Sequence, residues 1–149
     1  MRAVIQQVKN ANVVVESQEI SKIEKGFLVL LGIKDTDTMD DLAYVKKKIE
    51  KLRIFEDEEG KMNLSLKDVG GKILLVSQFT LFGDVRKGNR PSFIEAARPE
   101  KANEFYEIMK DELIKDGFDV ETGKFQTHMQ VGLVNDGPTT ILIDSERIL

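Results

Sequence analysis

The chain has 149 residues, of which 22 are basic and 26 are acidic, and a formal net charge of −4 at pH 7. This length fits one domain over residues 1–149, since two independent cores would need roughly 100 residues each. The absence of Cys excludes disulfides and thiolate chemistry, and the single His leaves too few imidazoles for a His-rich metal site. The excess of acidic residues argues against a protein that binds nucleic acid through its overall charge.

We expect no targeting signal in the first residues, because an apolar alternation starts at once, without a positively charged region or a cleavage site. The longest apolar run, residues 27–31, is far shorter than the roughly 20 residues that cross a bilayer. We therefore expect a cytoplasmic protein without a membrane segment, a metal ion or a cofactor.

The first third of the chain has the pattern of β-strands. Residues 3–8 and 12–15 are rich in β-branched side chains, and Lys9, Asn10 and Ala11 between them predict a short hairpin-like break. Residues 20–24 alternate between polar and apolar side chains. The apolar run at residues 27–33 predicts a strand that is buried on both faces.

Two later segments have the 3.6-residue period of helices. The first carries Leu42, Val45, Ile49 and Leu52, and Thr38 with Asp41 resembles a capping box at its start. The second runs from about residue 99 to 116 with Pro at its first turn, and Gly117 ends it. Its apolar stripe consists of Ala102, Phe105, Tyr106, Met109 and Leu113.

The remaining segments predict strands at residues 72–79, 118–121, 127–134 and 140–143, and a long ordered loop at residues 80–92. Two helices cannot cover both faces of seven or eight strands. The sequence therefore predicts a mixed α/β fold, a single-domain three-layer β/β/α sandwich-like stack with both helices on one outer face. Strand surface left uncovered in this arrangement hints at a dimer.

Ser77, Gln78, Phe79 and Thr80 stand where the apolar strand runs into the long loop, a common place for a binding site. The alternative is that these polar groups only satisfy the strand edge and turn the chain. No base accompanies Thr80 in the sequence, so a Thr nucleophile is poorly supported.

The segment from Asn135 to Thr140 has two interpretations. Asn, Asp, Gly and Pro in series are typical of a simple hairpin turn. However, the Gly137–Pro138 bond is also one of the few places where a cis peptide costs only about 0.5–1 kcal/mol over trans. A rigid cis bond would aim two carbonyl oxygens in a fixed direction, where they could read the stereochemistry of a ligand.

Two stretches, residues 46–53 and 84–101, hold more basic than acidic side chains. Either could contact phosphates, and either could be a solvated surface. His128 lacks partners in the sequence, so we assign it no role.

Together these pieces resemble one family, the D-aminoacyl-tRNA deacylases, nearly from end to end. The matching elements are Met1-Arg2-Ala3-Val4-Ile5-Gln6, Leu52-Arg53-Ile54-Phe55, Gly60-Lys61-Met62-Asn63, Leu75-Val76-Ser77-Gln78-Phe79-Thr80-Leu81, Gly88-x-Arg90-Pro91-Ser92-Phe93, Met129-x-Val131 and Asn135-Asp136-Gly137-Pro138.

The resemblance implies a tRNA-proofreading homodimer with its active site at the subunit interface. Such enzymes hydrolyse the ester between a D-amino acid, or achiral glycine as on mischarged tRNA-Ala, and the 3′-terminal adenosine of tRNA. Catalysis is assigned to the 2′-hydroxyl of the RNA, which activates water while protein N–H groups stabilise the oxyanion. A chain with no Cys and a single His has little acid–base machinery of its own, which suits this assignment.

The same resemblance assigns the site residues. Ser77, Gln78, Phe79 and Thr80 form the catalytic group, with Thr80 lining the site. The carbonyls of a cis Gly137–Pro138 from the partner reject L-substrates. Phe125 and Met129 lie near the terminal adenosine, and Asn135 completes the substrate-binding set.

The sequence departs from the family pattern at two places. Gln7 replaces the usual Arg that holds the Gly-Pro carbonyls, and related deacylases with Gln there have a trans bond, so the geometry of the Gly137–Pro138 bond stays open. Gln126-Thr127 replaces a usual Gly-Ala pair.

Two other functions compete with this one. A neighbouring activity in the same class would clear glycine or another small residue from the wrong tRNA. A different class would be a nucleic-acid-binding dimer with little catalysis, in which Gly137 and Pro138 form only a structural turn. The two basic stretches favour such a binding module, and the net charge of the chain opposes it.

Overall fold

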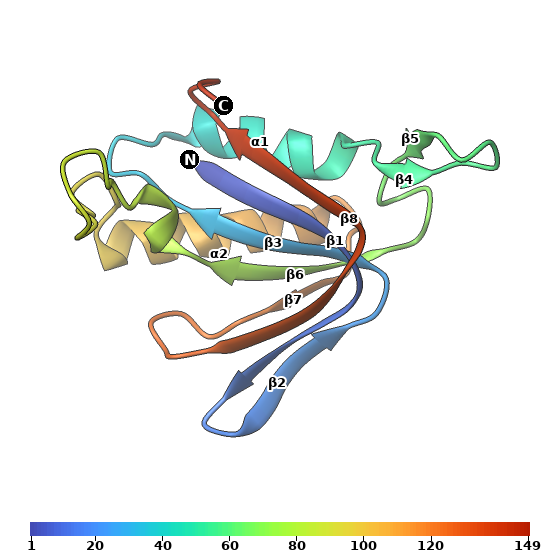
Figure 1. The fold of residues 1–149 in the computed structure, drawn as a ribbon, viewed down its shortest axis with the longest axis horizontal. Helices are drawn as coiled ribbons and strands as arrows, with labels where there is room; N and C mark the ends of the chain where they lie inside the picture. Colours follow the sequence, from blue (N-terminus) through green and yellow to red (C-terminus); the bar gives the residue numbers. More distant parts are fainter.

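The computed structural model describes residues 1–149, and a six-stranded mixed sheet organises the chain (Figure 1). The strand order is β2 (Gln18–Ile23), β1 (Arg2–Val15), β3 (Gly26–Gly32), β6 (Lys72–Ser77) and β7 (Val120–Thr122), and β8 (Gln130–Asp144) also pairs with β1. β1 pairs antiparallel with β2, β3 and β8, whereas the β3–β6 and β6–β7 pairs are parallel. β4 (Phe55–Glu56) and β5 (Met62–Leu64) form a separate hairpin.

β1 is one continuous strand of 14 residues, so the predicted hairpin-like break at Lys9 to Ala11 is wrong. The strand changes partners instead. Its first half, from Arg2 to Val8, pairs with β3, and its second half pairs with β2, while β8 follows it along nearly its whole length. Register shifts against β8 on both sides of Val8 absorb the irregularity that the sequence shows at this point. The change of partners folds the sheet over on itself.

β8 is also continuous, where the sequence predicts two strands joined by a turn. Gln6 pairs with Thr140 and Val8 pairs with Asn135, so the single residue Gln7 stands opposite four residues of β8, numbers 136–139. The predicted turn is therefore a bulge inside a long strand, held in the sheet by β1 on both sides.

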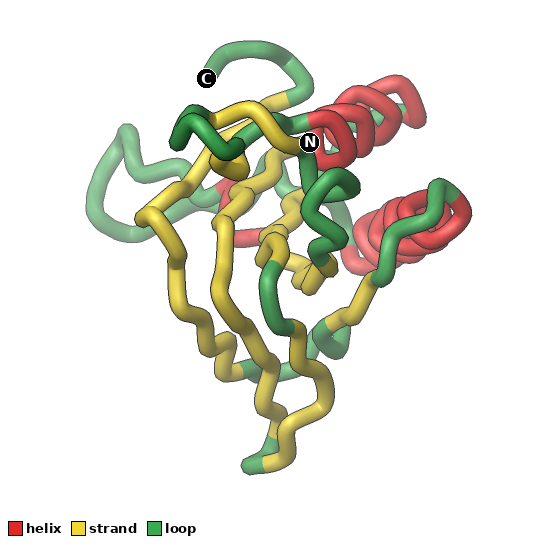
Figure 2. Tube along the Cα trace, turned by 90° about the vertical axis from the view of Figure 1, so that its right-hand side faces the viewer, coloured by secondary structure: helices red, strands yellow, loops and turns green.

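Both predicted helices are confirmed. α1 (Met39–Lys51) begins with a capping box between Thr38 and Asp41, and α2 (Pro99–Lys115) has Pro99 in its first turn. Figure 2 shows the two helices side by side on one side of the sheet. Neither of them is both long and apolar enough to cross a membrane.

Two apolar cores separate three layers. The larger core lies between the helices and the sheet, and it takes Phe27, Val29 and Leu31 from β3. The smaller core lies within the fold of the sheet, where Leu28 packs with side chains of β1, β2 and β6. Alternate residues of β3 thus enter different cores, which explains the uninterrupted apolar run. The predicted mixed α/β fold with a β/β/α arrangement is confirmed, and its two β layers are parts of one folded sheet.

The predicted long loop begins with a short 3₁₀ helix, η1 (Phe79–Phe82). A single turn of this kind has no repeat that periodicity could reveal. Beyond it, Asp84 and Ser92 exchange two backbone hydrogen bonds of 2.8 and 2.9 Å. This pairing closes the basic segment between them into a defined loop on the surface.

Candidate active site

A mostly apolar cavity of about 590 Å³ opens between two segments that are distant in the sequence. One wall comes from the end of β6 and the start of η1, with Ser77, Gln78 and Phe79. The opposite wall is the connection from β7 to β8, with Phe125 and Met129. Phe93 and the residues just before and in the first turn of α2 close a third side.

The sheet sets the position of η1. Directly after β6, the backbone N–H of Gln78 donates to Leu31 O of β3 at 2.8 Å before the chain turns. The N–H of Leu81 then donates to Gln78 O at 3.2 Å and closes the helical turn. The first N–H groups of such a turn have no acceptor within it. In η1 these are the N–H groups of Phe79 and Thr80.

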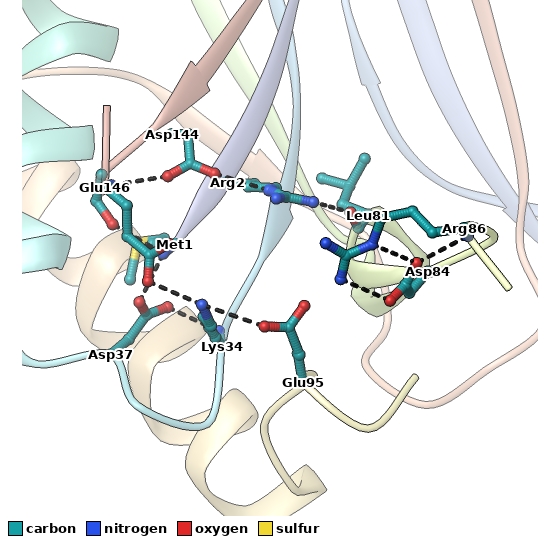
Figure 3. Close-up of polar contacts among 11 residues, drawn as sticks. Met1, Arg2, Lys34, Asp37, Leu81, Asp84, Arg86, Glu95, Asp144 and Glu146 are labelled. Carbon is teal, nitrogen blue, oxygen red and sulfur yellow. Dashed lines mark hydrogen bonds and ion pairs between the residues drawn. The ribbon is translucent and has the colours of Figure 1, made fainter. Parts of the chain in front are cut away.

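Arg2, the first residue of β1, holds the other end of η1 (Figure 3). Its guanidinium donates to Leu81 O at 3.0 Å and lies 4.8 Å from the centre of the Phe82 ring. A β-carbon on Gly32 would lie 3.1 Å from Gln78 O, so the strand beneath η1 packs closely against it. The turn is therefore tied down at both ends.

Thr80 does not line the cavity, and it is an exposed residue. Its hydroxyl accepts a hydrogen bond from Gln78 Nε2, and Gln78 is the only side chain that bonds to it. A nucleophilic Thr needs a base to take its proton. The structure thus adds no support for Thr80 as a nucleophile, and it links Thr80 to Gln78 as a polar pair.

Aromatic side chains form the walls of the cavity. Phe79 contacts Phe93 edge-to-face with ring centres 5.1 Å apart, although 54% of the Phe79 residue remains exposed. Phe125 packs against Tyr106, whose ring centre is 6.3 Å away. The Tyr106 hydroxyl donates to Leu75 O at 2.6 Å, and burial raises the pKa of this phenol well above its usual value. Tyr106 thus ties α2 to β6 beneath the cavity.

The connection from β7 to β8 has its own local constraints. A β-carbon at Gly123 would come within 2.7 Å of the Met129 sulfur, so Met129 uses the space that glycine leaves. Gln126 has φ 57°, in the left-handed region that favours glycine. This is the first position of the Gln126-Thr127 pair, where the resembled sequences carry Gly.

The β8 bulge holds the remaining predicted residues, and none of them lines this cavity. The Gly137–Pro138 peptide is cis, and both residues are exposed. Gly137 has φ 130°, and a β-carbon there would lie 2.4 Å from Thr139 Oγ1, so only glycine fits. The Asn135 side chain accepts from the Thr139 N–H at 3.1 Å and donates to Thr140 Oγ1 at 3.0 Å. Asn135 therefore braces the bulge.

Five of the nine predicted site residues meet in the cavity: Ser77, Gln78, Phe79, Phe125 and Met129. Sequence reasoning assigned no role to two further lining residues, Phe93 and His128. Phe93 ends one of the motifs that carry the family resemblance, which is the signal that could have identified it. His128 had no such signal. No three His, Asp or Glu side chains are grouped as metal ligands would be.

Comparison with known proteins identifies the family. A family model described as D-Tyr-tRNA(Tyr) deacylase matches residues 4–144. The chain is 56% identical to a D-aminoacyl-tRNA deacylase of Thermoanaerobacter sp. (strain X514) and 53% identical to one of Thermotoga petrophila, each over 99% of both chains.

Two solved structures share the fold of this chain. One, described as c-Myc DNA Unwinding Element Binding Protein, has a TM-score of 0.92 and 44% identity and covers 97% of this chain and 98% of its own. A probable eukaryotic D-amino acid tRNA deacylase, with a TM-score of 0.71 and 18% identity over 95% of this chain and 97% of its own, shares the fold. This chain belongs to the D-aminoacyl-tRNA deacylase family.

Proposed function

We propose that this chain is a cytoplasmic hydrolase that cleaves the ester of D-aminoacyl-tRNA. Water adds to the ester carbonyl, the bond to the ribose oxygen breaks, and free tRNA and a D-amino acid leave. In this proposal residues 1–149 act as one domain. The observation that carries it is the cavity, because Ser77, Gln78 and Phe79 of one family motif lie across it from Phe125 and Met129, which the resemblance places near the terminal adenosine.

The terminal adenosine enters the cavity between its aromatic walls. Apolar and aromatic side chains suit a nucleobase, which can stack on them and displace little bound water. The ester then lies near the start of η1, where the N–H groups of Phe79 and Thr80 have no acceptor within the turn. These two donors stabilise the negative charge that develops on the carbonyl oxygen.

The substrate supplies the remaining chemistry. Gln78 is the only side-chain partner of the Thr80 hydroxyl, and no acid or base is hydrogen-bonded to either residue. The 2′-hydroxyl of the terminal ribose stands beside the ester in every aminoacyl-tRNA, so it can orient and activate the attacking water. The protein contributes position, which is worth several kcal/mol when reacting groups are held in line.

Selection against L-substrates comes from the Gly137–Pro138 bulge of a second copy of the chain. Both residues are exposed in the single chain, and neither reaches its own cavity. The homodimer also has an apolar surface available. Leu142, Val4 and Leu30 lie in register across three strands on one face of the sheet, and 56% of Leu142 is exposed. Such rows pack readily against a second copy.

A filter of this kind acts on the side chain of the amino acid. It blocks one side of the α-carbon, so glycine, which has no side chain, also passes. Glycyl-tRNA-Ala is therefore a second substrate in this proposal. The alternative of a nucleic-acid-binding dimer with little catalysis draws on the name of the solved structure at 44% identity, which describes a DNA-binding protein.

Deacylation of D-tyrosyl-tRNA and L-tyrosyl-tRNA by the purified chain tests the function. We expect turnover of the D-ester and at least 100-fold slower turnover of the L-ester. Binding of tRNA without turnover of either ester would favour the binding module instead.

Two further comparisons test the mechanism. Ester linked to a 2′-deoxy terminal adenosine should react far more slowly than the natural substrate. Thr80→Ala and Gln78→Ala should both retain measurable activity or lose it to a similar extent, because the two form one polar pair. Complete loss with Thr80→Ala alone would overturn the RNA-assisted mechanism.

A further inference from the structure

The chain has a small set of cations without partners. Of the 22 Lys and Arg residues, 14 form an ion pair, a side-chain hydrogen bond or a contact with an aromatic ring. The eight others are Lys9, Lys47, Lys51, Lys87, Arg90, Arg98, Lys115 and Lys124.

Four of these eight, Lys87, Arg90, Arg98 and Lys124, lie on the two segments that border the cavity, and all four are exposed. We call these four residues the cavity rim. Arg98 stands between Ala97 and Pro99, which both line the cavity, and Lys124 directly precedes Phe125, another lining residue. Lys87 and Arg90 lie on the loop that leads to Phe93, and Phe93 also lines the cavity. Figure 1 shows this loop, in yellow-green and yellow, and the orange β7–β8 connection at the same end of the molecule.

The acidic side chains of the same loop do not neutralise the cavity rim. Asp84 pairs with Arg86 at 2.7 Å, and Arg86 lowers the pKa of the Asp84 carboxyl well below its usual range. Glu95 pairs with Lys34 at 3.4 Å. Both carboxylates are thus already paired with other cations, so the positive charge of Arg90 and Arg98 stays available.

Resting on the proposed function, we propose that the cavity rim binds the phosphates of the single-stranded 3′ end of tRNA. When the terminal adenosine fills the cavity, the preceding nucleotides leave it between the two rim segments. Exposed Lys and Arg along such a path bind phosphates without reading the bases. This suits an enzyme whose substrates share one 3′ end and differ elsewhere.

The other basic stretch of the chain offers a matched comparison. Lys47 and Lys51 on α1 are also exposed and form no ion pair, side-chain hydrogen bond or aromatic contact, but no residue of α1 lines the cavity. Removing two charges there changes the net charge of the protein as much as removing two charges from the cavity rim. A purely general electrostatic attraction would respond to both changes alike.

The test compares the double variants Arg98→Gln/Lys124→Gln and Lys47→Gln/Lys51→Gln with the unaltered chain. Each is assayed on D-tyrosyl-tRNA and on D-tyrosyl-adenosine, which has the ester and the base but no phosphate. The readout is the ratio of kcat/KM on the two substrates, measured from 50 to 200 mM KCl. Thermal unfolding checks that each variant is folded, and Arg98→Lys keeps the charge.

We expect the rim double variant to lower this ratio at least tenfold at 100 mM KCl. Each lost contact with single-stranded RNA reduces the slope of log(kcat/KM) on tRNA against log[KCl] by about 0.7, so the slope should become shallower by about 1.4. The α1 double variant and Arg98→Lys should keep the ratio within twofold of the unaltered chain.

Equal effects of the two double variants would overturn the inference, because they would show only general attraction. A parallel loss on both substrates would also overturn it, since the rim would then shape the cavity rather than bind phosphate. If the unaltered chain hydrolyses neither ester, the proposed function itself fails. If it hydrolyses both with equal, salt-independent efficiency, only the phosphate contact fails.

Discussion

The Arg2 guanidinium pairs with the Asp144 carboxylate, with Nε 2.8 Å from Oδ2, and the Asp144 side chain is only 2% exposed (Figure 3). The pair joins the start of β1 to the end of β8. The same guanidinium donates to Leu81 O, so it connects this pair to η1. One side chain thus links two strand ends to the turn whose N–H groups face the ester in our proposal.

Arg2→Gln should lower both stability and activity. It leaves the buried Asp144 carboxylate unpaired and Leu81 O without its donor, and hydrogen bonds to charged groups contribute about 1.5–3 kcal/mol. We expect a loss of about 2 kcal/mol in the free energy of unfolding by urea titration. Because η1 loses one anchor, kcat should fall at least tenfold with KM changed less than threefold.

Lys34→Gln is the control for Arg2. Lys34 lies in the same network and pairs with Glu146 at 2.8 Å, but it makes no contact with η1. It should leave kcat within twofold of the unaltered chain. An equal loss of kcat in both variants would show that Arg2 acts only through general stability.

Gly137→Ala should damage the β8 bulge. The new β-carbon would lie 2.4 Å from Thr139 Oγ1 and 2.9 Å from Thr139 N, at φ 130°. The bulge must shift to relieve this contact, so we expect the ratio of D-ester to L-ester turnover to fall at least tenfold. Gly60→Ala is the control, because Gly60 also has a positive φ, 74°, and nothing lies within 4 Å of its added β-carbon. An unchanged ratio in Gly137→Ala would contradict the role of the bulge in selection.

Glu50 should make stability depend on pH near neutrality. Burial raises the pKa of its carboxyl to about 7, and the neighbouring Asp116 carboxylate adds to the shift, while Lys46 and Lys51 oppose it. A folded pKa above the unfolded value means that the native state binds the extra proton. Stability that is present at pH 4.5 is therefore lost as the pH rises through about 7.

Glu50→Gln mimics the protonated carboxyl and should remove this dependence. The variant should melt at a higher temperature than the unaltered chain at pH 8 and at nearly the same temperature at pH 5. Other groups titrate over this range, so the difference between the two proteins is the quantity to follow by calorimetry. A difference that does not change with pH would contradict the assignment to Glu50.

Tyr106→Phe should reduce stability by about 1 kcal/mol, because it removes the 2.6 Å hydrogen bond to Leu75 O from a buried site. Tyr44→Phe is the matched control, since the Tyr44 hydroxyl has no hydrogen-bond partner in the chain, and it should change stability by less than about 0.5 kcal/mol. Chemical denaturation of both variants checks the difference. Equal effects would show that the Tyr106 bond adds nothing.

Both helices could be predicted from the sequence because their signals are local. The apolar stripe of α2, Pro99 at its start and Gly117 after its end all lie within one segment, and the structure follows them closely. The site was partly predictable for a similar reason, since Ser77 and Gln78 are polar residues at the end of an apolar strand. The family resemblance added Phe125 and Met129.

The sheet was less predictable, because strand pairing depends on partners that are distant in the sequence. Lys9 to Ala11 carry the signs of a turn, but β8 pairs across them and keeps β1 extended. The segment from Asn135 to Thr139 carries even stronger turn signs, and β1 retains it as a bulge in the same way. Local preference is worth only a fraction of a kcal/mol per residue, and a long ladder of hydrogen bonds outweighs it.

By itself, the sequence determined the helices, the buried strands, the family and the absence of thiol chemistry, because these follow from residue type and local period. Only the tertiary structure decided that Phe93 and His128 join the cavity, that Thr80 lies outside it, and that Arg98 and Lys124 stand next to residues that line it. These residues come from separate loops. Their positions relative to the cavity depend on how the sheet folds over and on where α2 begins. Neither can be predicted from a local sequence pattern.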